Sequence, residues 1–198
     1  MERQTKKLQI KPTKGDKRER TRSQLIEAAA EVINEKGFDR TSLEEVARRA
    51  GMTRGAIYNN FKDKEELFMA VSENRWKPIE PKLKKGASLK VQMNILGKAV
   101  VEAAEQRRAS AIGALSFQLY ALRNEEMRTR LAQTNAKIYV WAAEQLAQFI
   151  PPNELPLPPN EFVRVIHALT EGLLALHFMT PELITDEIII SSFEALAE

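Results

Sequence analysis

Hydrophobic residues recur along this chain at intervals of three and four positions, and no segment alternates hydrophobic and polar residues. This spacing is that of an amphipathic α-helix, so the pattern predicts an all-α protein. Helices are predicted over residues 16–36, 43–50, 54–60, 64–76, 89–106, 110–122, 125–150, 160–179 and 186–197. A linker with five prolines in nine residues, PPNELPLPP at 151–159, separates the last two helices from the others.

Polar residues and a glycine mark the ends of two short helices near the N-terminus. Ser42 followed by Glu45 is the pattern of a capping box, and Gly51 ends the same helix. Thr53 is placed to cap the next helix. Two short helices joined by a tight turn and preceded by a longer helix form a helix-turn-helix, which predicts a three-helix DNA-binding domain over residues 16–63.

The second short helix has an unusually polar outer face. Ile57 and Phe61 are four residues apart and are predicted to fix the helix to the domain core. In a helix-turn-helix this helix enters the major groove, where an arginine such as Arg54 can bond guanine or phosphate. The amides of Asn59 and Asn60 have the geometry that recognises adenine.

The same segment resembles a known family. The run RSQLIEAAAEVINEKGFDRTSLEEVARRAGMTRGAIYNNFKDKEELF, from Arg22 to Phe68, is similar to the DNA-binding domain of the tetracycline-repressor (TetR) family. Asn60 stands where that family usually has histidine. The residue types and the resemblance together predict DNA contacts by Arg22, Thr41, Thr53, Arg54, Gly55, Ala56, Tyr58, Asn59, Asn60 and Lys64.

Positive charge is concentrated at the N-terminal end. Residues 1–64 contain 16 Lys and Arg against 10 Asp and Glu, whereas residues 65–198 contain 14 against 17. The basic segment 1–15 is predicted to be a disordered, solvated tail, and the alternative is an arm that contacts DNA phosphates.

The resemblance implies that residues 64–198 form a ligand-binding and dimerisation domain, with 64–78 as a connecting helix that couples it to the DNA-binding domain. Large side chains of mixed polarity in the middle helices could line a ligand pocket, although most such residues are simply core. The pocket candidates are Phe117, Gln118, Tyr120, Tyr139, Trp141, His177 and Phe178.

The helix predicted at 160–179 carries apolar residues on more than one face, as does the last helix. One face is expected to pack within the chain and another against a second subunit, which favours a homodimer over a monomer with a deeply buried helix. The predicted interface residues are Phe162, Val165, Ile166, Leu169, Leu173, Leu176, Ile189 and Phe193.

Few residues suit catalysis or metal binding. The chain has no cysteine and two histidines, and it has no glycine-rich phosphate loop. His167 and Glu171, four residues apart, could share a metal, but a hydrogen-bonded pair is the favoured interpretation. We therefore expect no enzyme activity, no metal and no cofactor.

The sequence and the resemblance together predict a DNA-binding transcriptional regulator that acts in the cytoplasm. No apolar run reaches the roughly 18 residues of a membrane span. The predicted protein is a repressor that binds a pseudo-palindromic operator as a dimer and is released by a small hydrophobic or amphipathic effector. The alternatives are an activator, a helical ligand-binding module without specific DNA binding, and an architectural DNA-binding protein without an effector.

Overall fold

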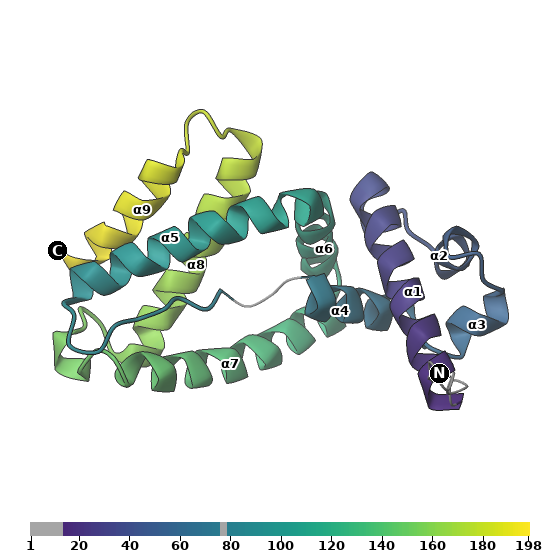
Figure 1. Cartoon of the computed structure of the whole chain (residues 1–198), viewed down its shortest axis with the longest axis horizontal. Helices are drawn as coiled ribbons and strands as arrows, with labels where there is room; N and C mark the ends of the chain where they lie inside the picture. The colour runs from purple at the N-terminus through teal and green to yellow at the C-terminus, as the bar shows by residue number, and fades with distance from the viewer. Residues whose placement is uncertain (1–13, 76–78) are drawn as a thin grey trace, which may run out of the picture.

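The computed structural model of the protein describes residues 14–75 and 79–198, which form helices and contain no strand (Figure 1). The helices before residue 76 are α1 (Lys14–Lys36), α2 (Leu43–Arg49), α3 (Arg54–Tyr58) and α4 (Lys64–Arg75). Those after residue 78 are α5 (Leu89–Arg107), α6 (Ala111–Arg123), α7 (Glu125–Ala147), α8 (Pro159–Met179) and α9 (Asp186–Glu194). Short 3-10 turns occupy 108–110, 152–154 and 195–197. The all-α prediction is confirmed.

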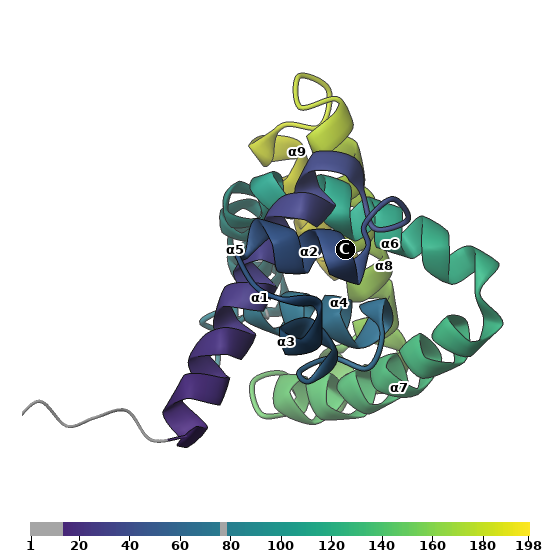
Figure 2. The ribbon, with the colours of Figure 1, turned by 90° about the vertical axis from the view of Figure 1, so that its right-hand side faces the viewer.

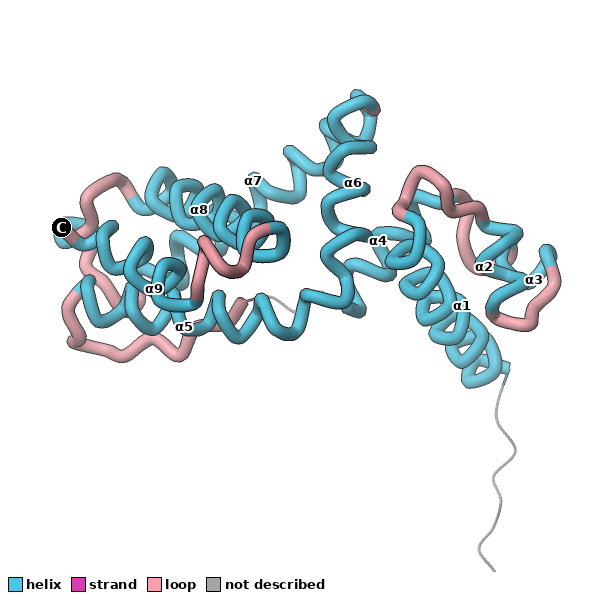
Figure 3. Tube along the Cα trace, turned by 90° about the horizontal axis from the view of Figure 1, so that it is seen from above, coloured by secondary structure: helices cyan, strands magenta, loops and turns pink. Residues whose placement is uncertain are grey.

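The helices form an elongated molecule with two ends of different size (Figure 1, Figure 3). Helices α1, α2 and α3 lie at the smaller end, and α5, α8 and α9 lie at the larger one. Helices α4 and α6 stand between the two ends. This arrangement makes α4 and α6 the candidates for passing a change from one end to the other.

The turn between α2 and α3 has the local features that the sequence predicts. The Ser42 hydroxyl accepts a hydrogen bond from the Glu45 amide at 3.3 Å, and the Thr53 hydroxyl accepts one from the Ala56 amide at 3.2 Å. Gly51 adopts a φ of 65°, a left-handed conformation that costs little for glycine. Both short helices are capped at their starts, and glycine adopts the left-handed backbone conformation of the turn without strain. These local features stabilise the helix-turn-helix.

Side chains of α2 fasten it to α1. The Arg49 guanidinium contacts the Glu35 carboxylate at 2.6 Å and the Glu31 carboxylate at 3.4 Å. The hydrogen bond from Arg49 holds the pKa of Glu35 below its usual value. These contacts fix the direction of α2, and with it the position of the turn that leads into α3.

Two hydrophobic cores support the two ends of the molecule. The first gathers residues of α1–α4, among them Leu67 and Phe68 of α4, and it also contains Phe117 and Met127 from α6 and α7. The second is built by α5, α7, α8 and α9. Because α4 contributes to the first core, it packs with the helix-turn-helix rather than with the second core.

A glycine brings α5 and α9 into close contact. A methyl group at Gly97 would lie 2.9 Å from the Cα atom of Ile190, so only glycine fits this helix crossing. Gly172 of α8, in contrast, has open space around it. Gly97 therefore allows α5 and α9 of the same chain to approach closely. The surface of α8 around Gly172 is not covered by another helix of the chain.

Several predicted helix ends differ from the observed ones. Helix α3 ends at Tyr58, two residues early, because Asn59 forms its C-terminal cap. Helix α7 ends at Ala147, and α9 gives way to a 3-10 turn after Glu194. Helix α1 begins at Lys14, so it includes residues 14 and 15, which were predicted to belong to the disordered tail. Residues 1–13 of that tail, and the predicted end of the connecting helix at 76–78, lie outside the described residues.

Helix α8 is the one helix in the described part of the chain with the length and composition of a membrane span. It packs against α5, α6 and α7, however, and it carries the charged residues Arg164 and Glu171. A central helix of a helical bundle meets the same criteria. Its hydrophobicity is accounted for by the second core and by an exposed apolar stripe that is described below.

Candidate nucleic-acid interface and ligand cavity

Helix α3 lies at the smaller end of the molecule, toward the viewer in Figure 2, and its exposed residues are mostly polar. Ile57 and Phe61 are fully buried in the first core, as their spacing predicts. The side chains on the opposite face point away from that core. Five of the predicted DNA contacts are exposed on this face, namely Thr53, Arg54, Gly55, Tyr58 and Asn59. Ala56 is half-buried beside them.

A carboxylate of α2 holds two of these exposed side chains. The Tyr58 hydroxyl donates a hydrogen bond to Glu44 Oε1 at 2.8 Å, and the Arg54 guanidinium lies 3.4 Å from the same oxygen. The Arg54 guanidinium also sits 5.4 Å from the centre of the Tyr58 ring. The hydrogen bond from Tyr58, more than the charge of Arg54, holds the pKa of Glu44 below its usual value. We call Glu44, Arg54 and Tyr58 the surface cluster.

Glu44 is a residue that sequence reasoning missed. Only Glu45 in the first turn of α2 was given a role, that of the capping box, and nothing in the spacing indicated that Glu44 faces α3. The available signal was the interval of ten residues to Arg54 across a helix-turn-helix, which brings the outer faces of α2 and α3 together.

The other predicted DNA contacts make hydrogen bonds within the domain. Thr41 is buried and its hydroxyl donates to the Gly37 carbonyl at 2.8 Å. Arg22 donates to the Asn60 carbonyl at 3.0 Å and lies over the Phe61 ring. These two side chains hold the turn and the end of α3 in place.

Asn60 and Lys64 also face inward. The Asn60 amide donates to the Ala56 carbonyl at 2.8 Å, while its Oδ1 atom is buried without a hydrogen-bond partner. The Lys64 ammonium lies 3.4 Å from the carbonyls of Phe38 and Asp39 and over the Phe38 ring. In this conformation both side chains, which are half-buried, contact the backbone of their own domain.

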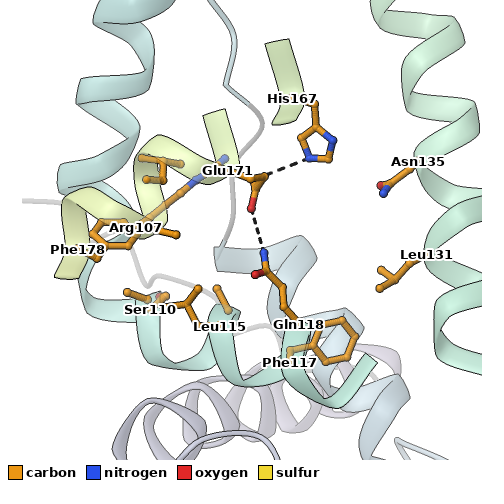
Figure 4. A pocket seen from close by; sticks show the side chains of 14 residues that line it. Arg107, Ser110, Leu115, Phe117, Gln118, Leu131, Asn135, His167, Glu171 and Phe178 are labelled. Carbon is orange, nitrogen blue, oxygen red and sulfur yellow. Dashed lines mark hydrogen bonds and ion pairs between the residues drawn. The ribbon is translucent and has the colours of Figure 1, made fainter. Parts of the chain in front are cut away.

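A cavity of about 350 Å³ opens between α5, α6, α7 and α8 (Figure 4). Three of the predicted pocket residues line it, namely Phe117, Gln118 and Phe178. Most of its wall is apolar. Its polar side chains are Arg107 of α5, Ser110 of the turn before α6, Gln118 of α6, Asn135 of α7, and His167 and Glu171 of α8.

The remaining pocket candidates lie elsewhere. Tyr139 and Trp141 line an adjoining cavity of about 390 Å³. The Tyr120 hydroxyl donates to the Glu65 carboxylate of α4, outside either cavity. His177 is buried, with its Nδ1 atom 2.7 Å from the Ile184 carbonyl, so it fastens α8 to the segment that leads into α9.

The pair His167 and Glu171 takes part in a chain of polar contacts rather than a metal site. Glu171 Oε2 accepts a hydrogen bond from Gln118 at 3.1 Å, and Glu171 Oε1 lies 3.9 Å from His167 Nε2. The other ring nitrogen of His167 lies 2.7 Å from the Tyr139 hydroxyl. Within residues 14–75 and 79–198, no three His, Cys, Asp or Glu side chains gather closely enough to hold a metal ion.

Helix α6 connects the cavity to the helix-turn-helix core. Phe117 lines the cavity and stacks on Phe68 of α4, with 3.8 Å between the ring centres. The Ser116 hydroxyl accepts a hydrogen bond from the Phe38 amide at 2.8 Å. The contact of Tyr120 with Glu65 adds a third link. The sequence indicated α4 as the coupling helix, whereas the structure gives α6 the contacts with both the cavity and the first core.

Burial also revises the predicted dimer surface. Phe162, Ile189 and Phe193 are at most 1% exposed and belong to the second core, so their side chains cannot reach a second subunit. Leu173 is buried as well, and Ile166 and Leu169 are half-buried. An exposed stripe remains along α8, which we call the α8 stripe. It consists of Val165, Ala168, Gly172, Leu176 and Met179.

Comparisons with known proteins agree with this fold. A sequence profile described as "Bacterial regulatory proteins, tetR family" matches residues 25–71, which span most of α1 through α4. The HTH-type transcriptional regulator SrpR of Pseudomonas putida is 26% identical over 158 residues, which are 79% of this chain and 74% of SrpR. Several other curated regulators match only a third of this chain or less, and 45% or less of their own length.

Solved structures are similar over nearly the whole chain. NalD, the secondary repressor of the MexAB-OprM multidrug efflux pump in Pseudomonas aeruginosa, is 27% identical with a TM-score of 0.62, covering 90% of this chain and 94% of NalD. A TetR-family regulator structure from Rhodococcus sp. has a TM-score of 0.70 at 21% identity, covering 89% of this chain and 96% of that one. These relatives are transcriptional regulators and not enzymes. Residues 25–71 thus match the DNA-binding region of the TetR family of bacterial transcriptional regulators, and the whole chain has the fold of solved TetR-family structures.

Proposed function

We propose that this protein is a dimeric repressor that binds a pseudo-palindromic operator through α3 and leaves it when a small molecule enters the cavity beside α6. The observation that carries the proposal is the position of α6. One of its side chains, Phe117, is both a wall of the cavity and a stacking partner of α4. A molecule that moves this ring therefore acts directly on the core that supports α3.

The DNA contacts of this proposal are the exposed residues of α3. Asn59 has the amide that recognises adenine, Arg54 can bond guanine or phosphate, and Tyr58 can donate to a phosphate. Thr53 and Gly55 lie at the start of the same helix and are exposed. The basic residues at the start of α1, Lys17, Arg18 and Arg20, are exposed and add positive charge at this end.

The dimer of this proposal forms through the α8 stripe. Val165 is 37% exposed and Leu176 is 46% exposed, although both are large and apolar. Ala168 and Gly172 lie between them, and their small side chains allow the helix of a second subunit to approach closely. Two copies related by a two-fold axis would present two α3 helices to the same side, and half-sites on DNA are about 34–36 Å apart.

Release of DNA follows from a change in the relative populations of two conformations. An effector shifts that equilibrium only by its difference in affinity for them. Its binding would reposition α6, and the Ser116 and Tyr120 contacts would carry the movement to Phe38 and Glu65. The spacing of the two α3 helices would then no longer match successive major grooves. The similarity to NalD, a repressor of a multidrug efflux pump, supports repression as the outcome.

The test is selection of bound sequences from a random duplex library with the purified protein, at a stated near-physiological salt concentration. We expect enrichment of one inverted repeat. The selected duplex placed upstream of a reporter should lower transcription, whereas a rise would identify an activator. Binding that depends on salt but enriches no motif would contradict the proposal and identify a general nucleic-acid surface.

A further inference from the structure

The three side chains of the surface cluster are joined so that each contacts the other two. Glu44 Oε1 accepts the hydrogen bond from the Tyr58 hydroxyl at 2.8 Å and lies 3.4 Å from the Arg54 guanidinium. The same guanidinium lies 5.4 Å from the centre of the Tyr58 ring. Because Glu44 belongs to α2 and the other two belong to α3, the position of Arg54 is set from both helices.

The surface cluster can bind a further partner. The Arg54 side chain is 74% exposed and the Glu44 side chain is 47% exposed. A guanidinium has several N–H donors in one plane, and both oxygens of a carboxylate can accept hydrogen bonds. The hydrogen bond from Tyr58 lowers the pKa of Glu44, so at neutral pH this carboxylate is ionised and only accepts. Donors and an acceptor therefore lie side by side on the exposed surface of the helix-turn-helix.

This combination of groups is complementary to the major-groove edge of a G·C base pair. Guanine presents two adjacent acceptors, N7 and O6, and the N4 amino group of cytosine follows them as a donor. The fork of an arginine bonds the two acceptors, and a carboxylate accepts from the cytosine amino group. An A·T pair offers no two adjacent acceptors in either orientation. Two donors with an acceptor beside them therefore fit G·C, and in one orientation.

We propose that Glu44 and Arg54 together recognise one G·C base pair in each operator half-site, with Arg54 on guanine and Glu44 on cytosine. This inference rests on the proposed function, because it names a base pair that the DNA-binding surface selects. Arginine has many rotamers, so Arg54 alone could bond guanine on either strand or turn to a phosphate. Glu44 contacts the guanidinium from one side and repels phosphates. The two residues therefore select the orientation of the base pair as well as its identity.

The test uses the inverted repeat selected from the random duplex library, with single base pairs changed in both half-sites. Fluorescence anisotropy gives the dissociation constants of the full-length protein at a fixed salt concentration. For the wild-type protein we expect one G·C pair whose inversion to C·G weakens binding at least about tenfold, as for a good bidentate contact. In Glu44→Ala the same inversion should weaken binding by less than about threefold, because Arg54 can then bond guanine on the other strand.

Removal of the arginine should change the base preference in a different way. Glu44 then remains, and a carboxylate can accept from adenine N6 as well as from cytosine N4. Arg54→Ala should therefore tolerate T·A in place of G·C, whereas the wild-type protein should reject it. Glu19→Ala on α1 and Arg48→Ala on α2, both at exposed positions, make the same charge changes outside the surface cluster. These controls should shift the affinities for all duplexes alike and leave the base preference unchanged.

Two outcomes would overturn the inference and leave the proposed function standing. In one, Glu44→Ala and Arg54→Ala change the affinities for all duplexes by a common factor, as a purely electrostatic or structural role would. In the other, no G·C pair of the half-site responds to either variant. Both side chains are exposed, so the variants should fold, and circular dichroism checks this. A library that enriches no inverted repeat contradicts the proposed function and the inference with it.

Discussion

Two carboxylates, one in each region of the molecule, hold neighbouring polar side chains, one on a convex helix surface and the other in the wall of a cavity. Glu44 holds Tyr58 and Arg54 at the outer surface of the helix-turn-helix. Glu171 holds Gln118 in the wall of a cavity and lies near the partly buried Arg107. Water screens the surface cluster, so its contacts exchange readily with DNA phosphates. Water also reaches Glu171, whose side chain is 43% exposed against 47% for Glu44, but Glu171 lies beside an apolar cavity wall.

The contrast extends to how each region is supported. The surface of α3 depends on local caps and turns, such as those of Thr53 and Gly51. The cavity depends on side chains that come from four helices separated in sequence. Changes at the surface should therefore alter DNA binding and leave the fold intact, whereas changes near α6 should alter stability and coupling together.

The largest effect should come from Phe117, where the two regions meet. Phe117→Ala removes a buried ring that contacts both Phe68 and Phe38. We expect the free energy of unfolding to fall by about 3–5 kcal/mol, as for other buried phenylalanines. Urea unfolding followed by circular dichroism measures it. Leu119→Ala on the same helix is the control, because Leu119 is exposed. A loss as small as that of the control would show that α6 does not support the first core.

The second prediction concerns the α8 stripe, through which the proposed dimer brings two α3 helices to one operator. Leu176→Glu places a charge in the proposed interface, and the two-fold axis brings a second copy of that charge close to it. We expect the dimer to weaken by about 2–4 kcal/mol, the range of a strong interface residue, and operator affinity to fall with it. Analytical ultracentrifugation measures the association. Leu122→Glu, at an exposed position on α6, should leave the dimer unchanged. A dimer unaffected by Leu176→Glu would place the interface elsewhere.

The two regions differ in how much the sequence could predict. Ser42, Gly51 and Thr53 form the local contacts that their spacing predicts, because caps and turns depend on a few adjacent residues. Phe162 and Phe193 show the limit. Helical spacing reveals that a face is apolar, but it does not reveal whether the same chain or a partner covers that face. Here the same chain covers both residues.

The cavity could be predicted least. Phe117, Gln118 and Phe178 were suggested by their size and mixed polarity. The pairing of Arg107 with Glu171 was not, since these residues lie on helices far apart in the sequence and neither belongs to a motif. Only the packing of α5 against α8 brings them to one wall.

The third prediction separates base recognition from phosphate binding on α3. Asn59→Ala removes an exposed amide that can recognise a base, so we expect it to cost about 1–3 kcal/mol on the selected operator and little on random DNA. Tyr58→Phe removes a hydroxyl that can reach a phosphate, and it should weaken both duplexes alike. Fluorescence anisotropy with both duplexes gives the comparison. Equal losses on both duplexes for both variants would contradict the assignment of α3 as the recognition helix.

The smallest effect should come from the surface cluster itself. Glu44 competes with DNA phosphates for Arg54 and Tyr58, and its negative charge also repels the duplex. Glu44→Gln keeps a hydrogen-bond acceptor for Tyr58 but removes the charge. We expect a severalfold gain in affinity for random DNA, a smaller gain for the operator, and thus reduced specificity. The gain should shrink as salt rises, because the effect is electrostatic at an exposed site.

The pH dependence of the surface cluster gives this last prediction an internal check. The hydrogen bond from Tyr58 lowers the pKa of Glu44, so the carboxylate is ionised throughout the neutral range. A depressed carboxyl pKa stabilises the fold at pH values above the unfolded pKa of about 4.3, and that contribution disappears as the pH falls through the lower folded value. The difference between Glu44→Gln and the wild-type protein should therefore stay constant from about pH 6 to 8. Glu144→Gln, the same charge change on the distant helix α7, should show no gain in DNA affinity. An equal gain in both variants would mean that net charge, and not the surface cluster, controls nonspecific binding.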